Sequence, residues 1–198
     1  MLAALDMNLS PLLLNGNALD ESSRKAVKES LGLIQELSNE VRTMSHLLHP
    51  PLLDESGLSS AIRWYTEGFA ERSKIRVDLD VPDDVGRLPR ELEMAVFRIV
   101  QECLTNIHRH SGSTVASIRI WRTASEIRIE VRDRGKGISP EKRADLDLPG
   151  KAGVGIRGMR ERVRQLSGNL EIKPGENAVG TVVFACFPIQ EIAKPVSA

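Results

Sequence analysis

Three polar residues at intervals of four, Glu102, Asn106 and His110, lie in a predicted helix over residues 89–110. This spacing places their side chains in one stripe beside an apolar face. An amide oxygen is a hard ligand that suits Mg²⁺, which usually takes one or two protein oxygens beside phosphates. We therefore expect Asn106 to bind Mg²⁺, and Arg109 and His110 to contact phosphate oxygens. Glu102 is a candidate second metal ligand, or a group that orients or deprotonates a nucleophile. Taken alone, such a stripe is more often a solvated helix face.

A carboxylate ends a predicted strand over residues 126–133. Asp133 shares the parity of the inward-facing residues Ile127 and Val131, so its side chain should point toward the core. A buried carboxylate needs a hydrogen-bond donor, and the exocyclic amine of adenine is such a donor. Guanine would place a carbonyl oxygen at the same position, which the carboxylate would repel. Gly135 and Gly137 would let the backbone approach the base closely. The alternative is an ordinary turn in which Asp133 bonds its own backbone.

A glycine-rich segment, residues 153–158, opens another predicted helix. Exposed backbone N–H groups at a helix start attract phosphate, so this segment is a candidate phosphate site. Its letters also match the dinucleotide-binding fingerprint GxGxxG, but a polar loop precedes it in place of the required buried strand. The P-loop pattern GxxxxGK[ST] does not occur in the sequence.

Composition restricts the class of protein. The chain has 198 residues, of which 41% are hydrophobic, enough for one well-packed domain and a smaller appendage. Acidic and basic residues number 27 each, so no global charge favours nucleic acid or direct contact with an anionic membrane. Cys103 and Cys186 form no metal-binding or disulfide pattern, and no stretch is long and apolar enough to span a bilayer. A cytoplasmic location is expected.

The N-terminal part reads as a helical hairpin. Apolar residues recur at spacings of three, four and seven over residues 27–48, and an earlier helix is expected over residues 2–14, with a turn at residues 15–17. Two apolar seams on so short a hairpin would stay partly exposed, so we expect a homodimer with a four-helix core. An intramolecular prop is the alternative. His49, Pro50 and Pro51 should end the helix.

The remaining pattern predicts an α+β fold, a mixed sheet covered on one face by helices. The helices are expected over residues 58–69, 89–110 and 156–166, and the strands over residues 75–81, 114–121, 126–133, 170–173 and 181–188. Residues 139–152 read as a loop. The predicted domains are residues 1–55, residues 56–190 and a tail of residues 191–198.

Four short motifs occur in order along the chain and resemble those of sensor histidine kinases. Residues 101–106 (QECLTN) resemble the asparagine box, residues 133–137 (DRGKG) and 153–162 (GVGIRGMRER) the first two glycine boxes, and Gly180-Thr181 the last. The sequence GMRERV at residues 158–163 and the sequence LHPPLLD at residues 48–54 resemble those of kinases that act with helix-turn-helix response regulators.

The resemblance implies a Bergerat-type α/β sandwich that binds ATP and Mg²⁺, with Asn106 on Mg²⁺, Asp133 on the adenine amine and residues 139–152 as the ATP lid. It also implies dimerisation through the N-terminal helices, an upstream sensor module and a response regulator receiver domain as partner. The nucleotide-binding residues expected on this basis are Asn106, Arg109, His110, Asp133, Gly135, Gly137, Ile138, Gly153, Val154, Gly155, Ile156, Gly158 and Thr181.

One feature of those kinases has no counterpart here. Their phospho-accepting histidine lies in a His-Asp pair on the first helix of the hairpin, and this chain resembles the stretch that follows the pair. His46 and His49 lack a following carboxylate and are expected to be structural. Three functions therefore stay open: a kinase core that uses a histidine from upstream sequence, an ATP-binding dimerisation module without turnover, and an anti-sigma-type serine kinase.

Overall fold

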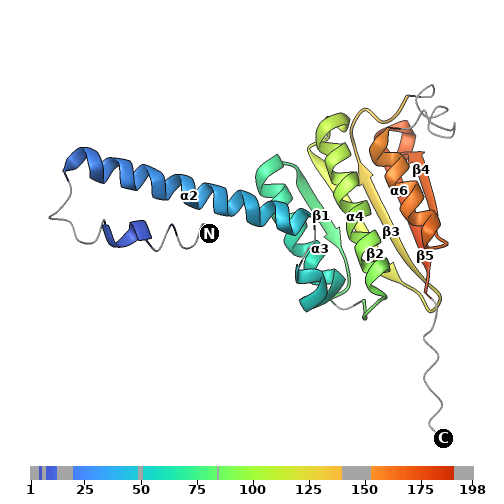
Figure 1. Cartoon of the computed structure of the whole chain (residues 1–198). Helices are drawn as coiled ribbons and strands as arrows, with labels where there is room; N and C mark the ends of the chain where they lie inside the picture. Colours follow the sequence, from blue (N-terminus) through green and yellow to red (C-terminus); the bar gives the residue numbers. More distant parts are fainter. Residues whose placement is uncertain are drawn as a thin grey trace, which may run out of the picture. The chain divides into compact units, whose positions relative to one another are not determined.

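The computed structural model describes residues 5, 8–12, 20–48, 51–83, 85–139 and 153–189. The chain divides into two compact units, residues 1–51 and 52–198 (Figure 1). The predicted turn at residues 15–17, His49, nearly all of the predicted lid and the predicted tail lie outside the described residues.

The first unit contains a long helix, α2 (Glu21–Leu48). It begins six residues before the predicted start at Val27 because Asp20 caps it: the Ser23 N–H donates to the Asp20 carboxylate at 2.6 Å. It ends at Leu48, as predicted from the prolines that follow. Ile34 is buried, whereas Leu33 and Leu37 are exposed. The predicted dimer stays a prediction.

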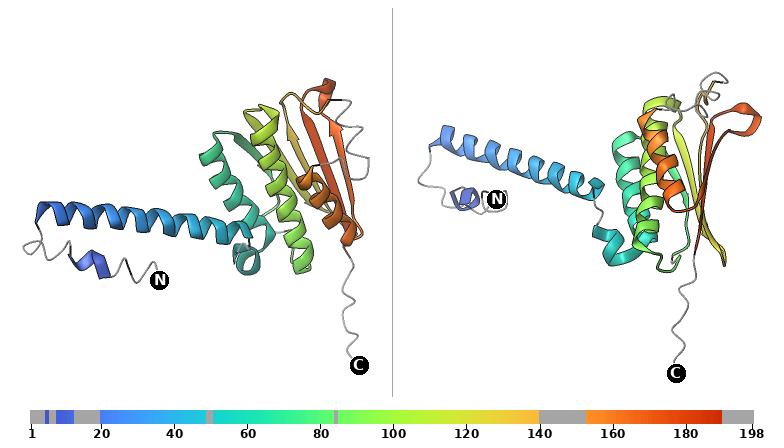
Figure 2. Two further views of the ribbon diagram at one scale, coloured as in Figure 1. Left: turned by 45° about the horizontal axis from the view of Figure 1, so that its top comes forward. Right: turned by 45° about the vertical axis from the view of Figure 1, so that its right-hand side comes forward.

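The second unit is a five-stranded mixed sheet with the strand order β1-β2-β3-β5-β4. Strand β1 (Arg76–Asp80) runs parallel to β2 (Val115–Arg122), whereas β3 (Glu126–Asp133), β5 (Thr181–Pro188) and β4 (Asn169–Pro174) pair antiparallel. Helices α3 (Pro51–Ser73), α4 (Arg90–Asn106) and α6 (Val154–Gln165) cover one face (Figures 1 and 2). The predicted α+β class is confirmed.

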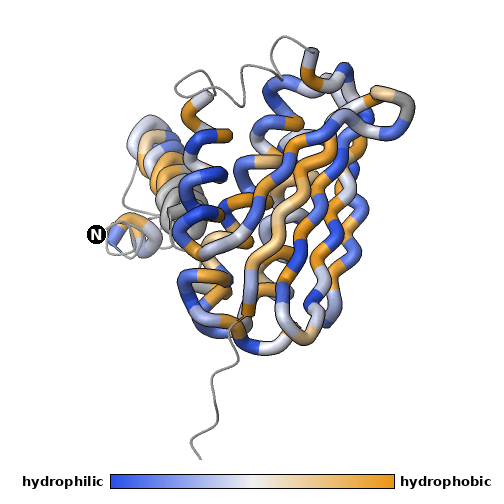
Figure 3. The backbone as a smooth tube through the Cα atoms, turned by 90° about the vertical axis from the view of Figure 1, so that its right-hand side faces the viewer, coloured by the Kyte–Doolittle hydropathy of each residue, from blue (hydrophilic) through white to orange (hydrophobic). Residues whose placement is uncertain are grey.

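The core lies between this helical layer and the sheet. Alternate residues of β2 and β3 are almost fully buried, and so is the apolar face of α4; the set includes Ile118, Ile120, Ile127, Ile129, Val96, Ile99 and Val100. The other strand positions carry ion pairs, such as Glu126 with Arg128 and Glu130 with Arg132. Figure 3 shows this alternation along the strands. Strand parity therefore placed the inward-facing residues of β3 correctly.

Helix α3 is longer than predicted because it consists of two helical pieces joined at Gly57, whose φ is 78°. A non-glycine residue would be strained at this kink. Arg87 stabilises the end of the first piece, since its guanidinium donates to the backbone oxygens of Leu53 and Asp54 at 3.5 and 3.4 Å. The sequence pattern shows only the second piece, which carries the helical periodicity.

The predicted continuous helix to His110 is wrong in its last turn. Helix α4 ends at Asn106, and a π-helical turn, η1 (Ile107–Ser111), follows and ends at Gly112 with a φ of 71°. A π turn contains more residues than an α turn, so His110 does not follow Asn106 with α-helical geometry. Periodicity in the sequence does not distinguish the two kinds of turn over five residues.

Gly180, the residue before β5, lies against the end of β3. Its φ is +75°, and a β-carbon there would lie 2.7 Å from the carbonyl carbon of Asp133. Gly112 has a similar φ of +71° but no neighbour within 4 Å of a β-carbon position. Alanine at position 112 would therefore add backbone strain alone, whereas alanine at position 180 would add both backbone strain and steric overlap.

We expect Gly180→Ala to destabilise the chain more than Gly112→Ala. The left-handed backbone costs a residue with a side chain about 1–2 kcal/mol at either position. The overlap with Asp133 adds about 1–3 kcal/mol at position 180 alone. Urea unfolding followed by circular dichroism measures both variants. Equal losses of unfolding free energy would show that the β3–β5 contact is not tight.

Candidate functional site

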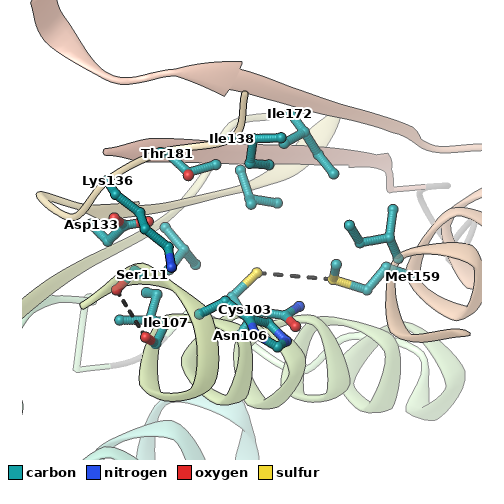
Figure 4. Close-up of a pocket in the computed structure, with 15 residues that line it drawn as sticks. Cys103, Asn106, Ile107, Ser111, Asp133, Lys136, Ile138, Met159, Ile172 and Thr181 are labelled. Carbon is teal, nitrogen blue, oxygen red and sulfur yellow. Dashed lines mark hydrogen bonds between the residues drawn. The ribbon is translucent and has the colours of Figure 1, made fainter. Parts of the chain in front are cut away.

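A pocket of about 330 Å³ lies between α4, η1, α6 and the ends of β3, β4 and β5. In Figure 4, Asp133, Lys136 and Ser111 lie at one end, while Cys103, Asn106 and Met159 line the helical side. The pocket brings together seven of the residues predicted from sequence: Asn106, His110, Asp133, Gly137, Ile138, Ile156 and Thr181.

Eight further lining residues were not predicted: Cys103, Ile107, Ser111, Val131, Lys136, Met159, Ile172 and Val183. Most are apolar side chains of helices and strands. Strand parity could have indicated Val131, two residues before Asp133, and helical spacing could have indicated Cys103 and Ile107 beside Asn106. Lys136 lies within the DRGKG motif itself.

The other predicted site residues do not line the pocket. Glu102 is half-buried beside Asn106, and Arg109 is exposed on η1. Gly153, Val154, Gly155 and Gly158 lie at the start of α6, where Val154 is 79% exposed. Gly135 packs against η1. Their contacts with a ligand stay predictions.

Asp133 points toward the core, as strand parity predicted, and is 7% exposed. One carboxylate oxygen accepts a hydrogen bond from the Gly135 N–H at 2.7 Å, which is the turn expected as the alternative. The second oxygen has no hydrogen-bond partner among the described residues. The turn and an inward-facing acceptor therefore coexist, because each uses a different oxygen.

Two hydrogen bonds hold the loop after β3 against the end of η1 and the residues that follow it. The Lys136 N–H donates to the backbone oxygen of Ser111 at 2.9 Å, and the Arg134 N–H donates to the Ser113 hydroxyl at 3.2 Å. A β-carbon at Gly135 would lie 2.6 Å from the Ser111 carbonyl carbon, so only glycine allows this approach. These contacts set where Asp133 lies relative to the end of α4.

Asn106 is oriented by the residue one turn earlier. Its side-chain nitrogen donates to a carboxylate oxygen of Glu102 at 3.2 Å. This hydrogen bond assigns the amide orientation and leaves the amide oxygen available as an acceptor. The arrangement therefore offers one hard oxygen ligand at the pocket wall.

Two sulfur atoms form part of the helical wall, since Cys103 Sγ lies 3.9 Å from Met159 Sδ (Figure 4). Burial raises the pKa of the Cys103 thiol, and the negative charge of Glu102 raises it further. The thiol therefore stays protonated at neutral pH. Because the thiolate is the nucleophile, Cys103 contributes packing and not covalent chemistry.

We compared the chain with known proteins. The family model for histidine kinase-, DNA gyrase B- and HSP90-like ATPases matches residues 91–191, about half of the chain. Sensor histidine kinase MctS of Rhizobium johnstonii is 33% identical over 149 residues, which cover 75% of this chain and 31% of that protein. Oxygen sensor histidine kinase NreB of Staphylococcus carnosus is 32% identical over 160 residues, covering 81% of this chain and 44% of that protein.

A solved structure has the same fold. The histidine kinase domain of the blue-light activated histidine kinase EL346 from Erythrobacter litoralis gives a TM-score of 0.61 at 20% identity, covering 95% of this chain and 94% of that one. The chain belongs to the histidine kinase-, gyrase- and HSP90-like ATPase family. Its named relatives are sensor histidine kinases, so neither alternative function is favoured. The chain spans less than half the length of these relatives.

None of the helices that the structure describes has an apolar stretch sufficient to cross a membrane.

We expect the two cysteines to differ sharply in alkylation. Cys103 is buried with a raised pKa, whereas Cys186 is partly exposed. A protein keeping only Cys103 (Cys186→Ser) should react with iodoacetamide at pH 8 on the order of a hundredfold more slowly than one keeping only Cys186 (Cys103→Ser). Mass spectrometry of the native protein, with urea-unfolded samples as control, measures both rates. Similar native rates would contradict the buried, protonated thiol.

Proposed function

We propose that this chain is the ATP-binding catalytic part of a sensor histidine kinase, and that its pocket binds Mg-ATP for transfer of the γ-phosphoryl group to a histidine outside residues 1–198. The observation that carries the proposal is the buried Asp133 carboxylate. One of its oxygens is held by the Gly135 N–H, and the other is an unpaired acceptor in a pocket whose opposite wall carries Asn106.

Adenine fits this pocket because its amine can donate to the free oxygen of Asp133, which guanine cannot do at the same position. The neighbouring lining is apolar, with Ile107, Val131 and Met159 available to pack on the faces of a purine. The free oxygen of Asp133 opens into the pocket, so the amine would take the place of solvent there. The pocket thereby combines one polar anchor with apolar walls.

The phosphates would extend from this pocket toward the start of α6. Asn106 would hold Mg²⁺ through its amide oxygen, since its nitrogen is engaged by Glu102. The backbone N–H groups of the first turn of α6 would meet phosphate oxygens, with Arg109 and His110 as further donors. The bound Mg²⁺ would neutralise charge on the phosphates.

Phosphoryl transfer depends mainly on positioning and on balancing charge. Glu102, beside Asn106, would orient or deprotonate the attacking imidazole. The sequence motifs support dimerisation through the N-terminal helices, an upstream sensor module, and a receiver domain of a helix-turn-helix response regulator as partner. A cytoplasmic location is part of the same proposal.

We expect Asp133→Asn to lower ATP affinity by about 30- to 150-fold, a loss of about 2–3 kcal/mol. The asparagine oxygen can keep the hydrogen bond from Gly135, but the asparagine NH₂ group would then face the adenine amine, and two donors cannot form a hydrogen bond. Calorimetry measures the affinity. Asp83→Asn is the matched control, because Asp83 is exposed and contacts Arg63 far from the pocket. Unchanged affinity in Asp133→Asn removes the adenine assignment.

Kinase activity is tested by phosphotransfer between separate chains. The chain is mixed with γ-³²P-labelled ATP, Mg²⁺ and, as a separate chain, a histidine-bearing helical hairpin of the sensor histidine kinase type. We expect acid-labile label on the hairpin, as for a phosphohistidine, and its loss with Asn106→Ala. Acid-stable label would indicate a serine kinase, and tight ATP binding without any transfer would indicate a binding module.

A further inference from the structure

The carboxylate of Glu102 lies directly against the first turn of α6. A β-carbon at Gly155 would overlap its Oε1 atom and would lie 2.6 Å from its Cδ and 3.3 Å from its Oε2. Gly155 is therefore the position at which α6 makes room for this side chain of α4. Gly158, one turn along, has nothing within 4 Å of a β-carbon position.

The first turn of α6 supplies no negative charge of its own. Its N-cap residue is Gly153, no side chain makes a capping hydrogen bond, and the turn contains no acidic residue. The start of a helix carries the positive end of the helix dipole, which attracts an anion. The Glu102 carboxylate lies against this turn and accepts a hydrogen bond from the Asn106 side chain at 3.2 Å, and among the described residues no N–H group of α6 donates to it.

We propose that Glu102 places its negative charge beside the first turn of α6 in the nucleotide-free chain, and that a nucleotide phosphate displaces it. Gly155 is the positioning residue, since a side chain there would exclude the carboxylate. The inference rests on the proposed function in one respect, that phosphates bind at the start of α6. It makes Glu102 a competitor of the phosphates before it acts on the attacking imidazole.

This arrangement differs from direct coordination of Mg²⁺ by Glu102. A metal ligand increases the affinity for Mg-ATP, so its loss weakens binding. A carboxylate that competes with phosphate decreases the affinity, so its loss strengthens binding, most clearly when no metal screens the phosphates. The sign of the change therefore separates the two roles.

The first experiment measures ATP affinity by calorimetry in EDTA. We expect Glu102→Gln to bind ATP about three- to tenfold more tightly than the wild type, from the removal of one like charge close to the phosphates. Glu161→Gln is the control, because Glu161 is on α6 but pairs with Arg164 in solvent. Unchanged or weaker binding by Glu102→Gln overturns the competition. Failure of the wild-type chain to bind ATP when Mg²⁺ is present would instead contradict the proposed function.

The second experiment tests the contact without nucleotide. We expect Gly155→Ala to be less favourable for the melting temperature in the wild-type background than in a Glu102→Ala background, because the new methyl group must move the Glu102 carboxylate. In a Glu102→Ala background the same change should be neutral or raise the melting temperature, since alanine favours helix. Gly158→Ala should be neutral or stabilising in both backgrounds. Equal effects of Gly155→Ala in the two backgrounds overturn its positioning role.

Discussion

The close approach of the β3 end to its neighbours is the constraint on which the site depends. Two glycines, Gly135 and Gly180, allow the backbone around Asp133 to contact η1 on one side and β5 on the other. Hydrogen bonds from Lys136 and Arg134 fasten the same loop to residues 111 and 113. A carboxylate on an ordinary loop would be solvated and mobile. Here the backbone contacts fix its position at the pocket end.

Much of this architecture follows from local sequence patterns. Strand parity placed Asp133 with the buried residues of β3, and helical spacing placed Asn106 on the pocket side of α4. Both are local properties of regular elements, so one stretch of sequence determines them. The mixed sheet followed from the order of helices and strands. Gly180-Thr181 was noticed only through the family resemblance.

Other features depend on contacts between distant segments, which no local pattern contains. The π turn at η1 changes the end of α4, and the kink at Gly57 extends α3 beyond its periodic part. Gly155 was predicted as part of a phosphate site, which stays a prediction, and its contact with Glu102 of another helix was not foreseen. The apolar lining was also missed, because residues such as Met159 and Ile107 serve the core and the pocket together.

The pair of sulfur atoms at Cys103 and Met159 bears on how a flat ligand would be held. Thioether and thiol groups are polarisable and make dispersion contacts that depend little on direction. Such side chains would pack against the face of an aromatic ring, but their contacts would not prevent the ring from rotating in its own plane. The hydrogen bond to Asp133 would then fix the orientation of the ring. The sulfur-containing side chains would contribute contact area, and Asp133 would determine which way the ring faces.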